Sequence, residues 1–188
     1  MIGNSPSAFR YVHRDQRRAD VRDVLLVRAD RWDAVNRTGR LRILTSSPRR
    51  SYNLEEFLPH VLPAQLDALE FVPVRGNVPT RVQKMWQPDI DGLVVAKAAL
   101  DRLLETEQAE FAHTSTALRR ALSECRWMVL PLSANPAAPG QGALAIEIKR
   151  ERKDLRDLLA TINCAETFQT VAREREILST FGGGCHQK

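Results

Sequence analysis

The sequence predicts an α/β fold built around a parallel-rich β-sheet. Between residues 40 and 105, short apolar runs alternate with amphipathic segments in the order strand, helix, strand, helix, strand, helix. Helix-start signals directly follow two of these strands, at Ser47–Pro48 and at Asn77. The hydrophobic content of 43% and the charged content of 27% are typical of an ordinary globular domain.

The first elements follow from local patterns. Residues 1–20 are polar and rich in arginine, and we expect a loose lead-in there. Residues 23–29 (DVLLVRA) indicate a short strand or a helix start, and residues 40–47 (RLRILTSS) indicate a strand that ends in a turn. A helix with Ser47 as N-cap and Pro48 at its first position should follow. Its apolar residues are Leu54, Phe57, Leu58 and Val61.

The next two strand–helix pairs repeat this order. Residues 69–76 predict a second strand, although Pro73 would remove a ladder hydrogen bond. A helix capped near Asn77 should follow it. Residues 90–100 predict a buried strand that runs into a third helix, through residue 105.

The second part of the chain is less regular. An amphipathic helix is expected at residues 114–125 and a strand at 127–132, before a connection rich in proline and glycine. A strand at 143–148 and a charged helix start at 149–157 come next. The last element should be a helix over 163–181, with Asn163 as N-cap and Glu166 three residues later in a capping box.

Composition excludes several protein classes. No run of about 18 apolar residues is present, so we expect no membrane association, and the N-terminus has no signal-peptide core. Cys125, Cys164 and Cys185 are widely spaced and odd in number, which favours a reducing, cytoplasmic setting over a disulfide framework. The net charge of +5 includes 23 Arg against 5 Lys. Arginine suits bidentate contact with carboxylate or phosphate, but a GC-rich genome would also produce this surplus.

Two predicted strand-to-helix turns carry basic and hydroxyl groups. The first holds Thr45, Ser46, Ser47, Arg49 and Arg50, and the second holds Arg75, Gly76, Asn77, Thr80 and Arg81. Helix N-termini favour anions, and turns at the carboxyl ends of parallel strands open onto one crevice. The turns therefore predict one surface for a ligand with several negative groups. They also fit plain helix caps with exposed arginines, and both interpretations stay open at this point.

Nucleic acid is a less fitting ligand, since aromatic residues make up only 6% of the chain and no reading module is visible. A carboxylate-rich small molecule fits better.

Cys185 follows three glycines, which would present its thiol on an exposed loop. No second pair of ligands at zinc spacing accompanies Cys185 and His186, so we expect no metal site. The glycines would also serve as a simple helix stop beside an incidental cysteine.

Four motifs occur in one order: TSSPRR, VRGNVPTR, APGQGALAIE and NCAETFQTVAREREILSTFGGGC. Their order and spacing resemble those of porphobilinogen deaminases, also called hydroxymethylbilane synthases, over roughly residues 14–188. The resemblance implies a transferase of porphyrin, tetrapyrrole and heme biosynthesis. Such an enzyme joins four porphobilinogens into a linear tetrapyrrole on a dipyrromethane cofactor, with loss of ammonia at each addition.

The resemblance also implies roles for particular residues. Cys185 matches the cysteine that carries the dipyrromethane through a thioether. The other cofactor-binding positions are Arg49, Arg50, Ser47, Thr45, Arg75, Gly76 and Arg81. Substrate carboxylates are expected at Arg49, Arg75, Arg81 and Gln141, with Gly142 beside Gln141 in the GQG segment.

The implied fold is a periplasmic-binding-protein-like α/β lobe followed by the beginning of a small α+β domain. After the lead-in, the second domain of the family would occupy residues 21–132, the interdomain crossing 133–150, and the start of the third domain 151–188. The family's first domain, with its pyrrole-assisting aspartate, has no counterpart here, so no catalytic residue is assigned. We therefore expect a chain that is incomplete and inactive alone, with a separate chain as a possible source of the first domain. The alternatives are a non-catalytic binding module for polyanionic small molecules and a degenerate remnant.

Overall fold

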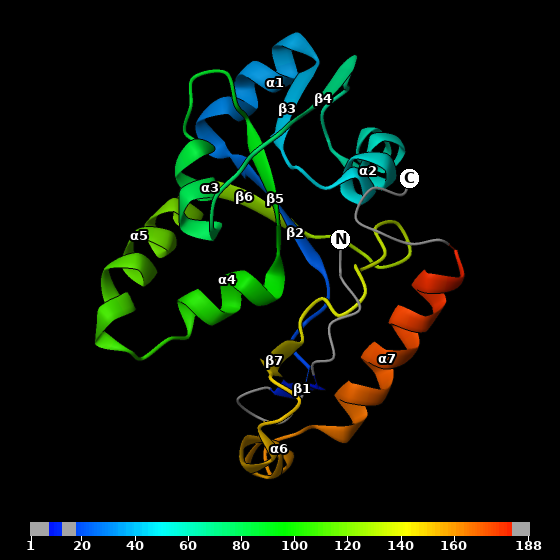
Figure 1. The fold of residues 1–188 in the computed structure, drawn as a ribbon. Helices are drawn as coiled ribbons and strands as arrows, with labels where there is room; N and C mark the ends of the chain where they lie inside the picture. The colour runs from blue at the N-terminus through cyan, green and yellow to red at the C-terminus, as the bar shows by residue number, and fades with distance from the viewer. Residues whose placement is uncertain (1–7, 13–17, 182–188) are drawn as a thin grey trace. The chain divides into compact units, whose positions relative to one another are not determined.

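The computed structural model describes residues 8–12 and 18–181 (Figure 1). These residues divide into two compact units, which we describe separately. The larger unit comprises residues 21–138, and the smaller unit combines residues 8–12, 18–20 and 139–181. Cys185 lies outside the described residues, and so do the expectations placed on its loop.

The larger unit contains a five-stranded sheet in the order β4-β3-β5-β2-β6. Its strands are β2 (Asp23–Arg28), β3 (Arg40–Leu44), β4 (Ala68–Val72), β5 (Gly92–Ala96) and β6 (Cys125–Val129). Strand β3 pairs in parallel with both β4 and β5, whereas β2 is antiparallel to β5 and to β6. The sheet is therefore mixed but rich in parallel pairing, as the sequence predicts.

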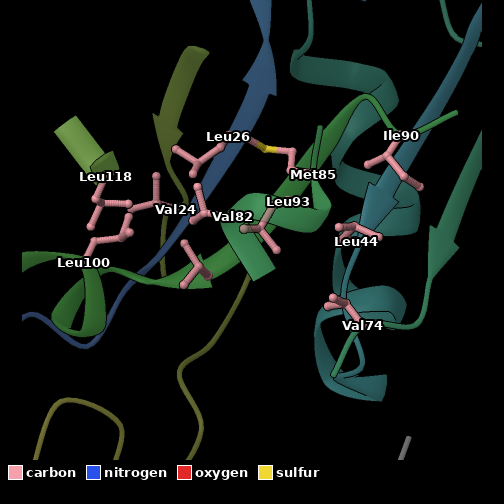
Figure 2. Packing of buried hydrophobic residues seen from close by; sticks show 11 residues of the cluster. Val24, Leu26, Leu44, Val74, Val82, Met85, Ile90, Leu93, Leu100 and Leu118 are labelled. Atoms are coloured by element: carbon pink, nitrogen blue, oxygen red, sulfur yellow. The ribbon is translucent and has the colours of Figure 1, made fainter. Parts of the chain in front are cut away.

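Helices cover both faces of this sheet because successive strand residues point to opposite sides. Val24 and Leu26 of β2 belong to one core cluster, which also includes residues of α3 (Val78–Lys84), α4 (Lys97–Leu104) and α5 (Ala112–Ser123) (Figure 2). Leu25 and Val27 face the other cluster, with α1 (Trp32–Thr38) and α2 (Pro48–Val61). Burial on both faces explains the continuous apolar run of β2.

Three expectations for this unit need correction. Residues 29–38 form a short 3-10 helix, Ala29–Arg31, followed by α1, and neither was expected. Strand β4 ends at Val72, because Pro73 cannot donate to the ladder, and so stops short of the expected residue 76. Strand β6 begins two residues earlier than expected, at Cys125, and a 3-10 turn (Ala109–Phe111) precedes α5.

The smaller unit is built on an antiparallel pair of strands, β1 (Ala8–Val12) and β7 (Leu144–Ile148). The expected loose lead-in is therefore wrong for residues 8–12, whose backbone groups pair with a strand distant in sequence. Two helices follow, α6 (Lys153–Ala160) and α7 (Ala165–Thr180). Within the described ranges, no helix is long and apolar enough to cross a membrane.

The N-cap of α7 also differs from the expectation. Cys164 occupies this position, one residue later than the predicted Asn163. The Oδ1 atom of Asn163 is buried and accepts no hydrogen bond from the described residues. The capping-box spacing from Asn163 to Glu166 therefore does not define the start of this helix.

Candidate functional site

The two basic turns lie next to each other at one edge of the larger sheet. Strands β3 and β4 are parallel, and Leu44 is in register with Val72, so both strands end at the same level. Backbone N–H of Thr45 donates to the Val72 oxygen at 2.9 Å. The Ser46 hydroxyl donates to the Val74 oxygen at 2.6 Å and accepts from the Val74 N–H at 2.7 Å. Ser46 thereby joins the first turn to the segment that leads into the second.

The Thr45 and Ser47 hydroxyls of the first turn accept hydrogen bonds from backbone N–H groups of the same turn. Ser47 is the N-cap of α2 and accepts from the Arg50 N–H, with Pro48 in the first turn of the helix as predicted. The Thr45 hydroxyl, in a residue that is buried, accepts from the Ser47 N–H at 3.2 Å. These bonds satisfy donors that a helix start leaves unpaired. They also set the direction in which α2 leaves the sheet, with Arg49 and Arg50 in its first turn.

Arg49 and Arg50 meet at one buried carboxylate, that of Asp23 at the start of β2. Arg50 binds it with a fork, from Nε to Oδ2 at 2.9 Å and from Nη2 to Oδ1 at 2.6 Å. Arg49 donates from Nη2 to Oδ2 at 2.8 Å, and the amide of Asn135 donates to the same oxygen at 2.9 Å. We call these four residues the Asp23 cluster. Two guanidiniums against one carboxylate leave a formal charge of +1.

The burial of the cluster is graded. The side chain of Asp23 is 0% exposed, that of Arg50 is 11% exposed and that of Arg49 is 22% exposed. Burial alone would raise the pKa of Asp23, but hydrogen bonds from Arg50, Arg49 and Asn135 and the charge of Arg50 outweigh it and hold the pKa below its ordinary value. The carboxylate therefore remains ionised at neutral pH. Positive charge reaches the surface mainly through Arg49.

The second turn depends on a glycine with left-handed backbone geometry. Gly76 has φ of 122°, and a Cβ there would meet the Thr80 Cγ2 at 2.7 Å. Its carbonyl oxygen accepts from the Nε of Arg81 at 2.7 Å, and the Arg75 oxygen accepts from Lys84 Nζ at 2.9 Å. Asn77 caps α3 through the Thr80 N–H at 3.0 Å, as predicted.

The side chain of Arg75 is exposed, and that of Arg81 reaches back over its own turn. The structure thus brings Arg49 and Arg50 together and sets the second turn beside them. Convergence of all four guanidiniums on one ligand stays a prediction.

Gln141 and Gly142 belong to the smaller unit. Gly142 has φ of 85°, and a Cβ there would approach the Ala19 oxygen to 2.5 Å. Arg18 donates from Nε to the Gln141 oxygen at 2.8 Å and pairs with Glu174 of α7 at 2.5 Å. Glu174 also accepts from the Gly140 N–H at 2.7 Å. The GQG turn is therefore fastened to α7 through its backbone.

The two described cysteines differ in acidity. Burial raises the pKa of Cys125 to about 11. Hydrogen bonding with Thr167, whose hydroxyl lies 3.1 Å from the Cys164 sulfur, lowers the pKa of Cys164. Both residues have intermediate exposure. No group of three or more potential metal-ligating side chains occurs in the part of the chain that the structure describes.

Sequence reasoning missed Asp23 and Asn135. The signal for Asp23 was present, because a carboxylate directly precedes the apolar run VLLV, whose four residues are all buried. Such a charge at the start of a buried strand requires a partner. Nothing local marks Asn135, which lies among breaker residues after β6 and is 1% exposed.

Comparison with known proteins identifies the family. The family model described as "Porphobilinogen deaminase, dipyromethane cofactor binding domain" matches residues 10–157. Porphobilinogen deaminase of Syntrophus aciditrophicus is 34% identical over 169 residues, which is 90% of this chain and 47% of that protein. Porphobilinogen deaminase of Clostridium novyi is 32% identical over 171 residues, with 90% of this chain and 49% of that protein covered.

Porphobilinogen deaminase 1 of Streptomyces avermitilis is 35% identical over 174 residues, which is 89% of this chain and 47% of that protein. The chain thus spans about half the length of these curated relatives. The basic turns and the buried arginine cluster described above lie within the matched region. The chain belongs to the porphobilinogen deaminase family.

Proposed function

We propose that the paired turns of the larger unit bind the carboxylates of a dipyrromethane cofactor and of the growing pyrrole chain. The observation that carries this proposal is the Asp23 cluster. It gathers two guanidiniums at the start of a 14-residue helix, beside a second basic turn, and keeps one excess positive charge there. Helix N-termini add a further preference for anions.

The residues present fit such a cofactor. Each pyrrole of a dipyrromethane carries acetate and propionate groups, and forked guanidiniums are suited to carboxylates. Arg49, Arg50, Arg75 and Arg81 would hold these groups, with Ser47, Thr45 and Gly76 shaping the turns, and Cys185 would form the covalent link. When bound, the cofactor supplies the primer to which further pyrrole units are joined. Arg49, Arg75, Arg81 and Gln141 would orient substrate carboxylates.

In this proposal, residues 21–132 are the second domain of the family, residues 133–150 the crossing segment, and residues 151–188 the start of the third domain. A sheet covered by helices on both faces is consistent with a periplasmic-binding-protein-like lobe. Cytoplasmic synthesis of a linear tetrapyrrole from four porphobilinogens would be the activity of the complete enzyme.

This chain alone should not complete that reaction. Condensation releases ammonia and develops positive charge on a pyrrole ring, which calls for a positioned carboxylate in a water-poor cleft. Among the described residues, the buried carboxylates are Asp23 and Asp91, and both are paired with arginines. Other acids of the larger and smaller units are exposed, where solvent screens their charge: Glu55, Glu56, Glu151, Asp154 and Asp157. In this proposal the group comes from outside these 188 residues, for example from a chain that carries the first domain.

The intact mass of the purified chain tests the covalent part of this proposal. An added dipyrromethane that disappears in the Cys185→Ala variant would support it. Incubation with porphobilinogen followed by oxidation should yield no uroporphyrin absorbance. Turnover by the pure chain would contradict the proposed inactivity, and an unmodified mass after mixing with a first-domain chain would favour a non-catalytic binding module.

Replacement of Arg49 tests the binding surface directly. Lysine keeps the charge but cannot reach Asp23, Asn135 and the Pro136 oxygen at once, as the Arg49 fork does. We expect Arg49→Lys to weaken porphobilinogen binding roughly tenfold, which corresponds to about 1.4 kcal/mol. Arg120→Lys on α5 is a matched control, since the Arg120 side chain is 84% exposed and should leave binding unchanged. Equal affinities of all three proteins would refute the site.

A further inference from the structure

In the Asp23 cluster, every guanidinium nitrogen of Arg50 donates to a protein acceptor. All three nitrogens of the Arg50 guanidinium are engaged, Nε and Nη2 by Asp23 and Nη1 by the Val94 oxygen at 3.3 Å. The carboxylate thus fixes the plane of this guanidinium as well as its place. A side chain held in this way has little freedom left to lose when a ligand arrives.

Asn135 extends this support to Arg49. Its Oδ1 accepts from Arg49 Nη1 at 3.0 Å, while its Nδ2 donates to Asp23. The Pro136 oxygen accepts from the same Nη1. Arg49 is thereby held from two sides, by β2 and by the segment after β6, and it remains the more exposed of the pair.

Two adjacent guanidiniums would repel each other without an anion between them. Both are largely withdrawn from water, so the repulsion would be poorly screened. Free of Asp23, each flexible side chain would swing toward solvent and recover its rotamer freedom. The carboxylate is what allows the two positive groups to stay close together.

We propose that Asp23, supported by Asn135, is a positioning residue that holds Arg49 and Arg50 as one preformed receptor for a ligand carboxylate. This inference rests on the proposed function, since it assigns the reason why the two arginines act together. Asp23 itself does not touch the ligand, because its side chain is 0% exposed and its oxygens are occupied.

The direction of the affinity change in Asp23→Asn decides the matter. A simple charge count predicts tighter anion binding, because the cluster would change from +1 to +2. Positioning predicts weaker binding despite the added charge, since two arginines must be immobilised again by the ligand. We expect the Kd for porphobilinogen, measured by calorimetry, to rise roughly tenfold. Unchanged or tighter binding would overturn the proposal.

Asp91→Asn is the matched control for loss of a buried ion pair. Asp91 is 4% exposed and pairs with Arg31 at 2.9 Å. Its carbonyl oxygen accepts from the backbone N–H of Arg28 at 2.8 Å, and Arg28 is five residues from Asp23 along β2, roughly 16 Å away. This variant should lose stability as Asp23→Asn does and retain porphobilinogen affinity. Equal weakening in both variants would mean that loss of stability, and not positioning, explains the effect.

A second variant and a ligand-free measurement complete the test. Asn135→Ala leaves the charge unchanged and should also weaken binding, and it decides the question alone if Asp23→Asn does not fold. Phenylglyoxal should modify Arg49 and Arg50 severalfold faster in either variant, as followed by peptide mass spectrometry. If the unaltered chain binds no porphobilinogen, the proposed function fails, but the modification rates still test whether Asp23 and Asn135 position the two arginines. Equal modification rates in the parent and both variants would overturn the positioning role.

Discussion

Gly76→Ala should destabilise the larger unit by about 2 kcal/mol. The added Cβ would lie 2.7 Å from Thr80 Cγ2 and 2.9 Å from Thr80 Cβ, at a φ of 122° that side-chain-bearing residues rarely adopt. Backbone strain of this kind costs about 1–3 kcal/mol, and overpacking adds about 1–3 kcal/mol where the neighbour cannot yield. Thr80 is restrained, since its hydroxyl donates to Asn77 Oδ1 at 2.7 Å.

Two effects reduce this sum. Alanine lowers the conformational entropy of the unfolded chain, which stabilises the folded state by about 0.4–1 kcal/mol. The exposed turn can also shift and relieve part of the clash. The net loss of about 2 kcal/mol corresponds to a fall in Tm of roughly 6–10 °C for a unit of this size. Urea and thermal unfolding followed by circular dichroism would measure it.

Two further variants separate strain from clash. Thr80→Ser removes the Cγ2 methyl and keeps the hydroxyl, so in the Gly76→Ala background it should restore about 1 kcal/mol. Gly140 also has a positive φ, of 77°, but a Cβ at this position would meet only Val171 Cγ1, at 3.5 Å. Gly140→Ala should lose less stability than Gly76→Ala. A Gly76→Ala variant as stable as the parent, or one that loses no more than Gly140→Ala, would refute the reasoning.

Three other outcomes are expected. Because the pKa of Asp23 is lowered in the folded state, its ion pairs stabilise the fold fully at pH values above the ordinary pKa of 3.8 and lose this effect as the pH falls through the folded-state pKa. Urea unfolding should therefore show that the difference in stability between the parent and Asp23→Asn shrinks below about pH 4. In a Cys185→Ser background, iodoacetamide should modify Cys164 before Cys125, because their pKa values are shifted in opposite directions; faster labelling of Cys125 would contradict this. Leu26→Ala, in the core of Figure 2, should cost about 2–5 kcal/mol by chemical unfolding, and a loss below 1 kcal/mol would mean that the site collapses around the deletion.

The accurate predictions from sequence were those whose cause is local. Ser47 and Asn77 cap their helices as expected, because each cap joins a side chain to a backbone N–H only three residues away. Family motifs, read in order, identified the family and its cofactor domain. The capping-box pattern at Asn163 was misleading, since a one-residue shift of the helix start changes which residue is the N-cap.

By itself, then, the sequence determined the family, the helix starts at the two basic turns and an α/β sheet rich in parallel pairing. The tertiary structure alone decided that β2 runs antiparallel within this sheet and that residues 8–12 pair with β7. It also decided that Asp23 and Asn135 hold Arg49 and Arg50. The hydrogen bonds of this cluster join residues that lie 26 to 112 positions apart in the chain. Contacts over such separations leave no periodic or neighbouring signal in a single sequence, because they arise only when the sheet closes and a buried charge must find its partners.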